Sequence, residues 1–138
     1  MAAFVMATML EGCPLIYSSQ EIGYSKSLSF FNNNVMKWDS NKSYTDEYIK
    51  VMKAYNSTRD VRVSDPVLAN TGNVAKMTYT NSIGESFVVM VHTKNEKATV
   101  KVPLAIAGKE VTDLMPGETI VAATAIAMEP YQYLLYRK

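Results

Sequence analysis

The segment from Glu85 to Pro103 constrains the fold of this chain more than any other. It reads ESFVVMVHTKNEKATVKVP, two runs rich in β-branched residues separated by a polar turn. Apolar and polar residues alternate through the second run, with Ala98, Val100 and Val102 on one face. A period of two is typical of a strand with one buried face. The segment therefore predicts two strands joined by a turn at 94–97.

The rest of the C-terminal half shows the same pattern. The sequence MPGE places Pro116 and Gly117 as a type II turn requires, and YQYLLYRK alternates again at the end of the chain. Short strands between regularly spaced turns predict an antiparallel β-sandwich over residues 65–138, as one domain of a mainly β protein. The predicted interior consists of Phe87, Val89, Val91, Val100, Val102 and Leu135.

Residues 1–60 have a different character and predict a helix, a strand, a loop and a second helix. Residues 2–10 are apolar on every side, which indicates a helix buried all round, and Gly12 is placed to end it. Residues 15–17 form a short apolar run that predicts a buried strand. A polar loop over 25–42 follows.

The second predicted helix covers residues 43–55. Its apolar residues recur at i, i+3, i+4 and i+7 from Tyr48 to Tyr55. Ser43 and Asp46 fit a capping box at its start.

The composition excludes several classes of function. The chain has 14 basic and 13 acidic residues, a balance that gives no reason to expect binding to nucleic acid or to a membrane surface. No apolar run is long enough to span a bilayer. One cysteine, Cys13, and one histidine, His92, exclude an internal disulfide and a zinc cluster, and the sequence says nothing about the compartment. Cys13 is expected to be a small buried residue. No glycine-rich phosphate loop is present, and no cofactor is predicted.

Polar residues with chemical potential follow the predicted strand. In GCPLIYSSQEIG, residues 12–23, an amide and a carboxylate, Gln20 and Glu21, come directly after the apolar run. Among the acids, only Glu21 and Asp39 are placed to share a cleft, and their spacing does not require it. Trp38 and the tyrosines could stack on sugar rings or simply anchor a loop. The residues alone therefore give no complete active site.

The same stretch resembles the last barrel strand of the α-amylase family of glycoside hydrolases. Later segments resemble that family's final barrel helix (YTDEYIKVMKAY) and the strands of its C-terminal sandwich (ESFVVMVHTKNEKATVKVPL, VTDLMPGE and MEPYQYLLY). Ser18 and Ser19 stand where the family often has an aromatic residue and a glycine. The motif is carried by Gly12, Pro14, Ile16, Tyr17, Gln20, Glu21 and Gly23.

The resemblance implies that residues 1–60 correspond to the end of a TIM barrel and residues 65–138 to the sandwich that follows it. The family's nucleophile and acid/base lie on earlier strands, so it implies that the catalytic acids lie upstream of residue 1. Barrel enzymes place catalytic residues at the C-terminal ends of their strands. Tyr17, Gln20 and Glu21 are then expected beside the catalytic residues, in a supporting position, and no metal ligand is expected.

Two classes of function follow. The first is a structural C-terminal portion of an α-amylase-like hydrolase whose parent enzyme acts on an α-glucan or oligosaccharide. The second is a stand-alone sandwich that binds carbohydrate through aromatic residues such as Trp38. A bare apolar surface on residues 1–60 would favour the first class, and an exposed planar row of aromatics the second. Without a barrel, residues 1–24 must either fold back onto the sandwich or pair with another copy, and we expect self-association through residues 1–24 and 45–55.

Overall fold

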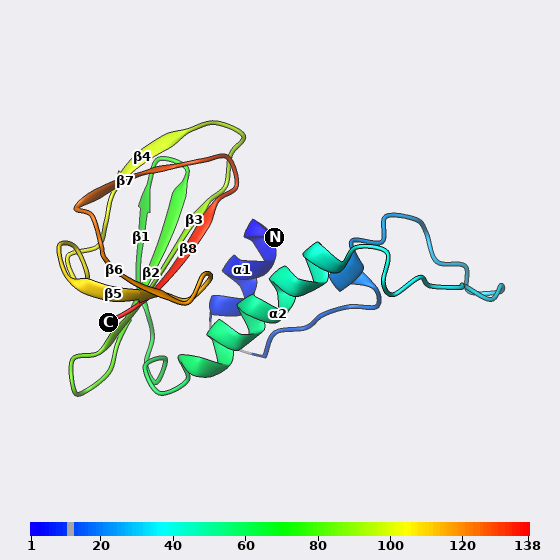
Figure 1. The fold of residues 1–138 in the computed structure, drawn as a ribbon, viewed down its shortest axis with the longest axis horizontal. Coiled ribbons are helices and arrows are strands. Elements are labelled where there is room, and N and C mark those ends of the chain that lie inside the picture. Colours follow the sequence, from blue (N-terminus) through cyan, green and yellow to red (C-terminus); the bar gives the residue numbers. More distant parts are fainter. Residues whose placement is uncertain (11–12) are drawn as a thin grey trace.

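The computed structural model describes residues 1–10 and 13–138 and consists of a β-sandwich with two helices packed on one face (Figure 1). The helical elements are α1 (Ala2–Met9), the 3₁₀ helix η1 (Gln20–Ile22) and α2 (Lys42–Ser57). The strands are β1 (Val67–Thr71), β2 (Val74–Thr80), β3 (Ser86–His92), β4 (Ala98–Lys101), β5 (Glu110–Asp113), β6 (Glu118–Val121), β7 (Ala125–Met128) and β8 (Tyr133–Arg137).

The strands form two antiparallel sheets, which confirms the predicted sandwich. The larger sheet has the order β1-β2-β3-β8-β5-β6, and the smaller sheet pairs β4 with β7. The long central strand β3 pairs with β2, where Met77 lies opposite Val89, and with β8, where Leu135 lies opposite Val89. A turn with Gly117 at φ 81° joins β5 to β6, as the MPGE signal predicts.

One core lies between the two sheets. Val88 and Met90 of β3 face the small sheet, where Val100 is 3% exposed and pairs with Ile126. The alternation predicted for the strand at 98–101 is therefore present, because Val100 is buried while Thr99 and Lys101 are exposed. This core is contained entirely within residues 74–136.

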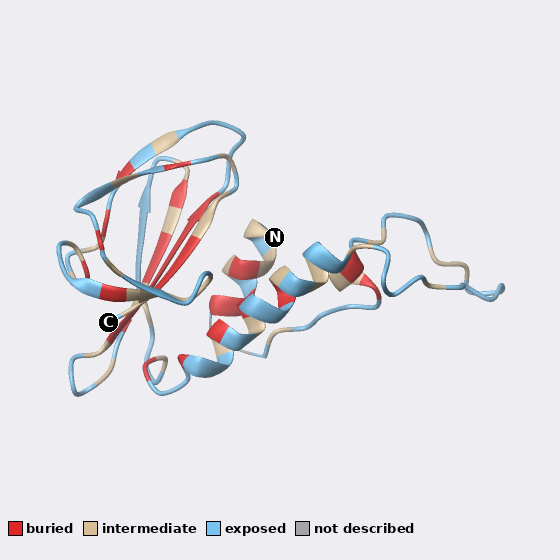
Figure 2. Ribbon diagram, viewed as in Figure 1, coloured by how far each residue is buried: buried red, intermediate tan, exposed pale blue. Residues whose placement is uncertain are grey.

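A second core lies on the other face of the large sheet, beneath the helices. Val5 and Met9 of α1 and Val51 of α2 are fully buried against that face (Figure 2). All seven residues of β3 are buried as a result, since helices cover one side and the small sheet covers the other. The sheet residues of this core are Met77, Tyr79, Phe87, Val89, Val91 and Leu135.

This second core includes the N-terminal helix. The apolar residues of α1 fold back onto the sandwich, with Val5 and Met9 in the same cluster as Phe87 and Leu135. The predicted interior residues are all buried, but they belong to two cores rather than one. Self-association through residues 1–24 and 45–55 stays a prediction for the surface that remains exposed.

Several local predictions for the first half are wrong. Residues 13–17 form no strand, and Leu15 is 77% exposed, because the described part of residues 1–60 offers no strand for them to pair with. Cys13 is exposed for the same reason. Helix α1 is not buried all round, since Ala3 and Ala7 are exposed. The predicted helix stop at Gly12 lies outside the described residues.

The second helix is confirmed but begins differently. The cap of α2 is Asn41, and no side chain closes a capping hydrogen bond there, so the predicted box of Ser43 and Asp46 does not form. The Oγ of Ser43 instead donates to Oδ1 of Asn41 at 3.3 Å. The buried residues Tyr48, Val51 and Ala54 lie on the face that meets α1, η1 and the sheet.

Between η1 and α2 the chain forms the predicted polar loop, which extends away from the body (Figure 1). Phe30 and Phe31 are 100% and 97% exposed near its tip. Two hydrogen bonds hold the turn: Asn34 Nδ2 donates to the Ser29 carbonyl oxygen at 2.7 Å, and the backbone N–H of Asn32 donates to Ser29 Oγ at 3.1 Å. None of the helices in the described residues is long and apolar enough to cross a membrane.

Candidate functional site

The short helix η1 presents the amide and carboxylate singled out in the sequence. It is bracketed by two residues in the left-handed region, Ser19 at φ 64° and Gly23 at φ 65°. The N–H of Gly23 donates to the carbonyl oxygen of Gln20 at 2.9 Å and ends the helix. A Cβ at Gly23 would lie 3.3 Å from the ring of Tyr44, so this glycine serves both the backbone angle and the close approach of α2.

Helix α2 fixes the orientation of η1 through two hydrogen bonds. Gln20 Nε2 donates to the hydroxyl of Tyr48 at 3.0 Å, and Thr45 Oγ1 donates to the carbonyl oxygen of Glu21 at 3.0 Å. The other end of the Gln20 amide accepts from the backbone N–H of Tyr17 at 3.3 Å. The structure therefore brings Tyr17, Gln20 and Tyr48 into one connected set.

Tyr48 is the central residue of this set, although the helical spacing predicted it only as an apolar residue of the second helix. It is 4% exposed, and its ring lies 4.5 Å from that of Phe4 and 5.3 Å from that of Tyr44. Burial raises the pKa of the Tyr48 phenol, while the bond from Gln20 acts in the opposite direction. A neutral hydroxyl held in this way orients the Gln20 amide.

Glu21 carries an unpaired acceptor. Its Oε2 atom is buried and has no hydrogen-bond partner among the described residues. A buried carboxylate oxygen needs a hydrogen-bond donor, and water can supply one where the protein does not. The carboxylate borders a groove, and that position leaves room for a donor.

The groove runs between η1 and the outer face of α2 and has a volume of about 570 Å³. Glu21 and Trp38 both line it, and Trp38 is 57% exposed. Tyr17 is 70% exposed and does not line this groove, and neither does the exposed Asp39. The apolar part of its lining comes from Ile16, Trp38, Ile49 and Met52.

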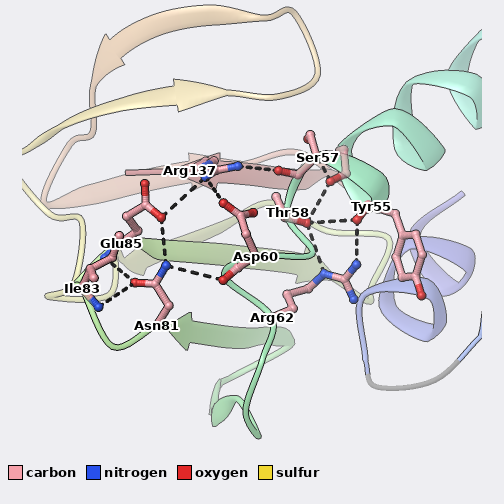
Figure 3. A network of polar contacts seen from close by, with 10 residues as sticks. Tyr55, Ser57, Thr58, Asp60, Arg62, Asn81, Ile83, Glu85 and Arg137 are labelled. Carbon is pink, nitrogen blue, oxygen red and sulfur yellow. Dashed lines mark hydrogen bonds and ion pairs between the residues drawn. The ribbon is translucent and has the colours of Figure 1, made fainter.

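The far end of α2 is tied to the sandwich by a polar network (Figure 3). Arg137 of β8 donates to the backbone carbonyl of Ser57, and its Nη2 lies 2.5 Å from the Asp60 carboxylate and 3.6 Å from that of Glu85. The bond from Arg137 lowers the pKa of Asp60. Asn81 joins the network by donating to Glu85 at 2.8 Å.

The same network stabilises the end of the helix itself. The guanidinium of Arg62 donates to the backbone carbonyl oxygen of Tyr55 at 2.6 Å and lies 4.0 Å from the centre of the Tyr55 ring. Its Nε donates to Thr58 Oγ1 at 3.1 Å (Figure 3). Cations near the last carbonyl groups of a helix are favourable.

A second tie joins the middle of α2 to the sandwich. The hydroxyl of Tyr133 in β8 donates to the carboxylate of Glu47. Burial, followed by this bond to Glu47, strongly raises the pKa of the Tyr133 phenol. The helix that orients η1 is thus held to the same strand, β8, at Glu47 and again at Ser57.

His92, the one histidine of the chain, does not line the groove. It is fully buried at the end of β3, where Nδ1 lies 2.9 Å from the carbonyl oxygen of Glu129 and Nε2 has no partner among the described residues. Its backbone N–H donates to Gln132 at 2.9 Å. Within the described residues, no three His, Cys, Asp or Glu side chains are grouped so that they could hold a metal ion.

The sequence is similar to that of a curated enzyme. The chain is 27% identical over 143 residues to the cyclomaltodextrinase of Geobacillus thermopakistaniensis, and the match covers 96% of the chain but 24% of that enzyme. No family model matches the chain. The chain thus spans about a quarter of the length of this curated relative.

Solved structures show the same fold. The α-amylase of Geobacillus thermoleovorans matches with a TM-score of 0.79 at 15% identity, over 99% of this chain and 32% of that one. An Anoxybacillus α-amylase matches with a TM-score of 0.75 at 20% identity, over 99% and 31%. The chain therefore matches the C-terminal part of α-amylase-family enzymes, and its sandwich has the fold of their C-terminal domain.

Proposed function

We propose that this chain is the structural C-terminal part of an α-amylase-like glycoside hydrolase that acts on α-glucans, and that the catalytic acids lie outside it. The observation that carries the proposal is a bare apolar surface on residues 13–57. Ile16 and Ile49 line the groove and are 36% and 45% exposed, and Leu15, next to Ile16 in the chain, is 77% exposed. An apolar surface of this kind marks an interaction site. The remainder of a barrel is the partner that the proposal assigns to it.

In this proposal the sandwich positions η1 through α2. Strand β8 holds α2 at Glu47 and Ser57, and α2 in turn holds Gln20 and Glu21 through Tyr48 and Thr45. Tyr17, Gln20 and Glu21 then support the rim of an active site whose reacting groups come from elsewhere. The unpaired Oε2 of Glu21 is available to a donor from the neighbouring part of the barrel.

The proposal also assigns a domain boundary and a contact surface. The boundary between the barrel-derived part, 1–60, and the sandwich, 65–138, lies in the connection after α2. Residues 1–24 and 45–55 provide the contact surface, and in the absence of a barrel a second copy can cover it.

The proposal that the parent enzyme acts on an oligosaccharide is supported by structural neighbours that were solved with maltose, maltotriose or acarbose.

The alternative, a carbohydrate-binding module, rests on Trp38. Its half-exposed ring lines the groove together with Ser18 and Asn56, which could hydrogen-bond to sugar hydroxyl groups. Aromatic faces beside such polar groups are suited to sugar rings, but the lining is mostly apolar, which favours a protein partner.

The proposal is tested with the purified chain. Retaining hydrolysis needs two carboxylates about 5–5.5 Å apart, so we expect no release of reducing sugar from soluble starch or maltotriose. Turnover that Glu21→Gln abolishes would overturn the proposal, because a contaminating amylase would not respond to that change. Affinity electrophoresis in starch separates the alternative. Retardation that Trp38→Ala removes and Phe31→Ala leaves unchanged would favour the binding module.

A further inference from the structure

The strand β1 leaves one edge of the large sheet open. It is the first strand in the sheet order, and all five of its residues are exposed (Figure 2). Its sequence, VLANT, contains no charge. Proteins usually protect such an edge with charged residues, proline or a bulge, because unpaired backbone groups attract another strand. The proline nearest to this edge, Pro66, comes before the strand and does not protect it.

The hairpin geometry identifies which backbone groups point outward. Strands β1 and β2 are joined by the two residues 72–73, and Thr71 lies opposite Val74. In such a hairpin the closing pair exchanges both backbone bonds, and bonded and non-bonded pairs then alternate. Thr71, Ala69 and Val67 therefore bond to β2. Leu68 and Asn70 direct their N–H and C=O groups away from it.

No described residue takes up these outward groups. The backbone hydrogen bonds outside the helices and strands include none to Leu68 or Asn70. The only charged residue of the hairpin formed by β1 and β2 is Lys76, which is 7% exposed. Its side chain lies on the face of the sheet that meets β4, where Nζ donates to Thr71 Oγ1 at 3.0 Å and to the Lys101 carbonyl oxygen at 2.8 Å. The edge is therefore uncharged as well as open.

We propose that β1 is a self-pairing edge, which joins β1 of a second copy in antiparallel register with Ala69 opposite Ala69 across a two-fold axis. In this register Leu68 of each copy lies opposite Asn70 of the other. The two pairs then exchange four backbone hydrogen bonds, so every outward group is satisfied.

The sequence of the strand selects this register. A shift that places Leu68 opposite itself leaves Asn70 opposite Pro66, which has no N–H. A shift that places Asn70 opposite itself sets Leu68 against Gly72, which lies in the turn at φ 59°. Both alternatives lose bonds that the Ala69-centred register makes.

Side chains beside the edge fit the same partner. A mainly apolar groove of about 360 Å³ lies between β1 and the end of α1, lined in part by Met6, Leu10, Leu68 and Met77. Leu68 is 64% exposed at its border. In the paired register the partner's Leu68 lies diagonally across from this one on the same face, so the grooves of the two copies become continuous.

Disulfide trapping tests the register directly. In a Cys13→Ser background, Ala69→Cys places two thiols on the two-fold axis, at a non-bonded pair with Cα atoms about 4.5 Å apart, within the range that a disulfide spans. We expect covalent dimers under mild oxidation at micromolar protein. Thr71→Cys is the matched control on the same face. Its two copies would lie about 13 Å apart and stay unlinked. Equal crosslinking of the two variants would overturn the proposal.

Sedimentation of the full chain tests the association itself. We expect a dimer that Asn70→Pro weakens at least tenfold, because proline removes an outward N–H without breaking a bond to β2. The circular dichroism spectrum should stay unchanged. Ile49→Lys distinguishes this surface from residues 1–24 and 45–55, since it lies on the outer face of α2. A wild-type monomer at 100 micromolar, or a dimer disrupted by Ile49→Lys but not by Asn70→Pro, would overturn the proposal, and the second result would support the other surface.

Discussion

The hydroxyl of Tyr79, in β2, donates a hydrogen bond of 2.5 Å to the backbone carbonyl oxygen of Met9, at the end of α1. Both residues are buried, at 1% and 0% exposure. The last carbonyl groups of a helix have no partner within the helix, and this one is too deep for water. One phenol thus satisfies the end of α1 and fixes it on the sheet, although 70 positions separate the two residues.

Tyr79→Phe is therefore expected to destabilise the protein by about 1–3 kcal/mol, because it leaves the Met9 carbonyl buried and unpaired. The ring of Tyr79 would still pack against Phe87, whose centroid lies 6.1 Å away. Tyr131→Phe, at a residue that is 53% exposed, is the control and should leave the free energy of unfolding unchanged. Urea denaturation measures both, and equal midpoints for the two variants would contradict this account.

A second prediction concerns the backbone at Ser19. Its φ of 64° is unfavourable for a residue with a Cβ, by about 1–2 kcal/mol. Ser19→Gly and Ser19→Ala both remove the hydroxyl, so their difference isolates the Cβ. The glycine variant should be more stable than the alanine variant by about 1 kcal/mol. The same pair of changes at Ser18 should give the opposite order or no difference, which thermal unfolding can check.

The contact between Arg137 and Asp60 should make stability depend on pH. The bond from Arg137 lowers the pKa of Asp60 below its ordinary value of 3.8. A carboxyl group whose pKa is lowered by folding adds to the free energy of unfolding above about pH 4. That contribution is lost as the pH falls through the pKa of the folded state. Asp60→Asn should therefore destabilise the protein at neutral pH, and its difference from the wild type should shrink in acid.

The comparison with the wild type matters because other carboxyl groups titrate in the same range. Burial raises the pKa of Asp113, which acts in the opposite direction. Asp65→Asn, at an exposed residue, is the control for the loss of a charge. The Asp60 carboxylate is solvent-accessible, so the effect should also weaken with added salt. A difference between Asp60→Asn and the wild type that is the same at neutral and acid pH would show that Asp60 acts without its charge.

The sandwich could be predicted because alternation and turns are local signals. Val100 and Thr99 face opposite ways in the sequence pattern and in the structure. The run SFVVMVH is different, because its seven residues are buried on both faces and show no period. The sequence could therefore predict that Val89 is buried, but not that it lies under the helices while Val88 faces the small sheet.

The parts that could not be predicted depend on contacts between distant segments. Residues 15–17 have the composition of a buried strand, yet a strand forms only where another can pair with it, and Leu15 stays exposed. For the candidate site, the motif located Gln20 and Glu21, but the spacing of α2 marks Tyr48 only as an apolar residue, and its bond from Gln20 joins residues 28 positions apart. Arg137 and Asp60 are 77 positions apart, and no local pattern joins them.

The last prediction concerns a truncated chain that begins at Asp65. The alternating pattern suggests that residues 65–138 are self-sufficient, and the core between the two sheets does lie within them. The other face of the large sheet, however, is covered by α1 and α2. The side chains that would become exposed there are Met77, Tyr79, Phe87, Val89, Val91 and Leu135.

Burial of one such side chain is worth about 1.5–3 kcal/mol, so the six together represent on the order of 10 kcal/mol, comparable with the whole stability of a domain. We therefore expect the truncated chain to aggregate or to bind a hydrophobic dye, as light scattering and dye fluorescence would report. Deletion of residues 27–36 from the exposed loop is the matched control and should leave the protein folded. A truncated chain that stays monomeric and unfolds at the same urea concentration as the full chain would show that the sandwich does not need its helices.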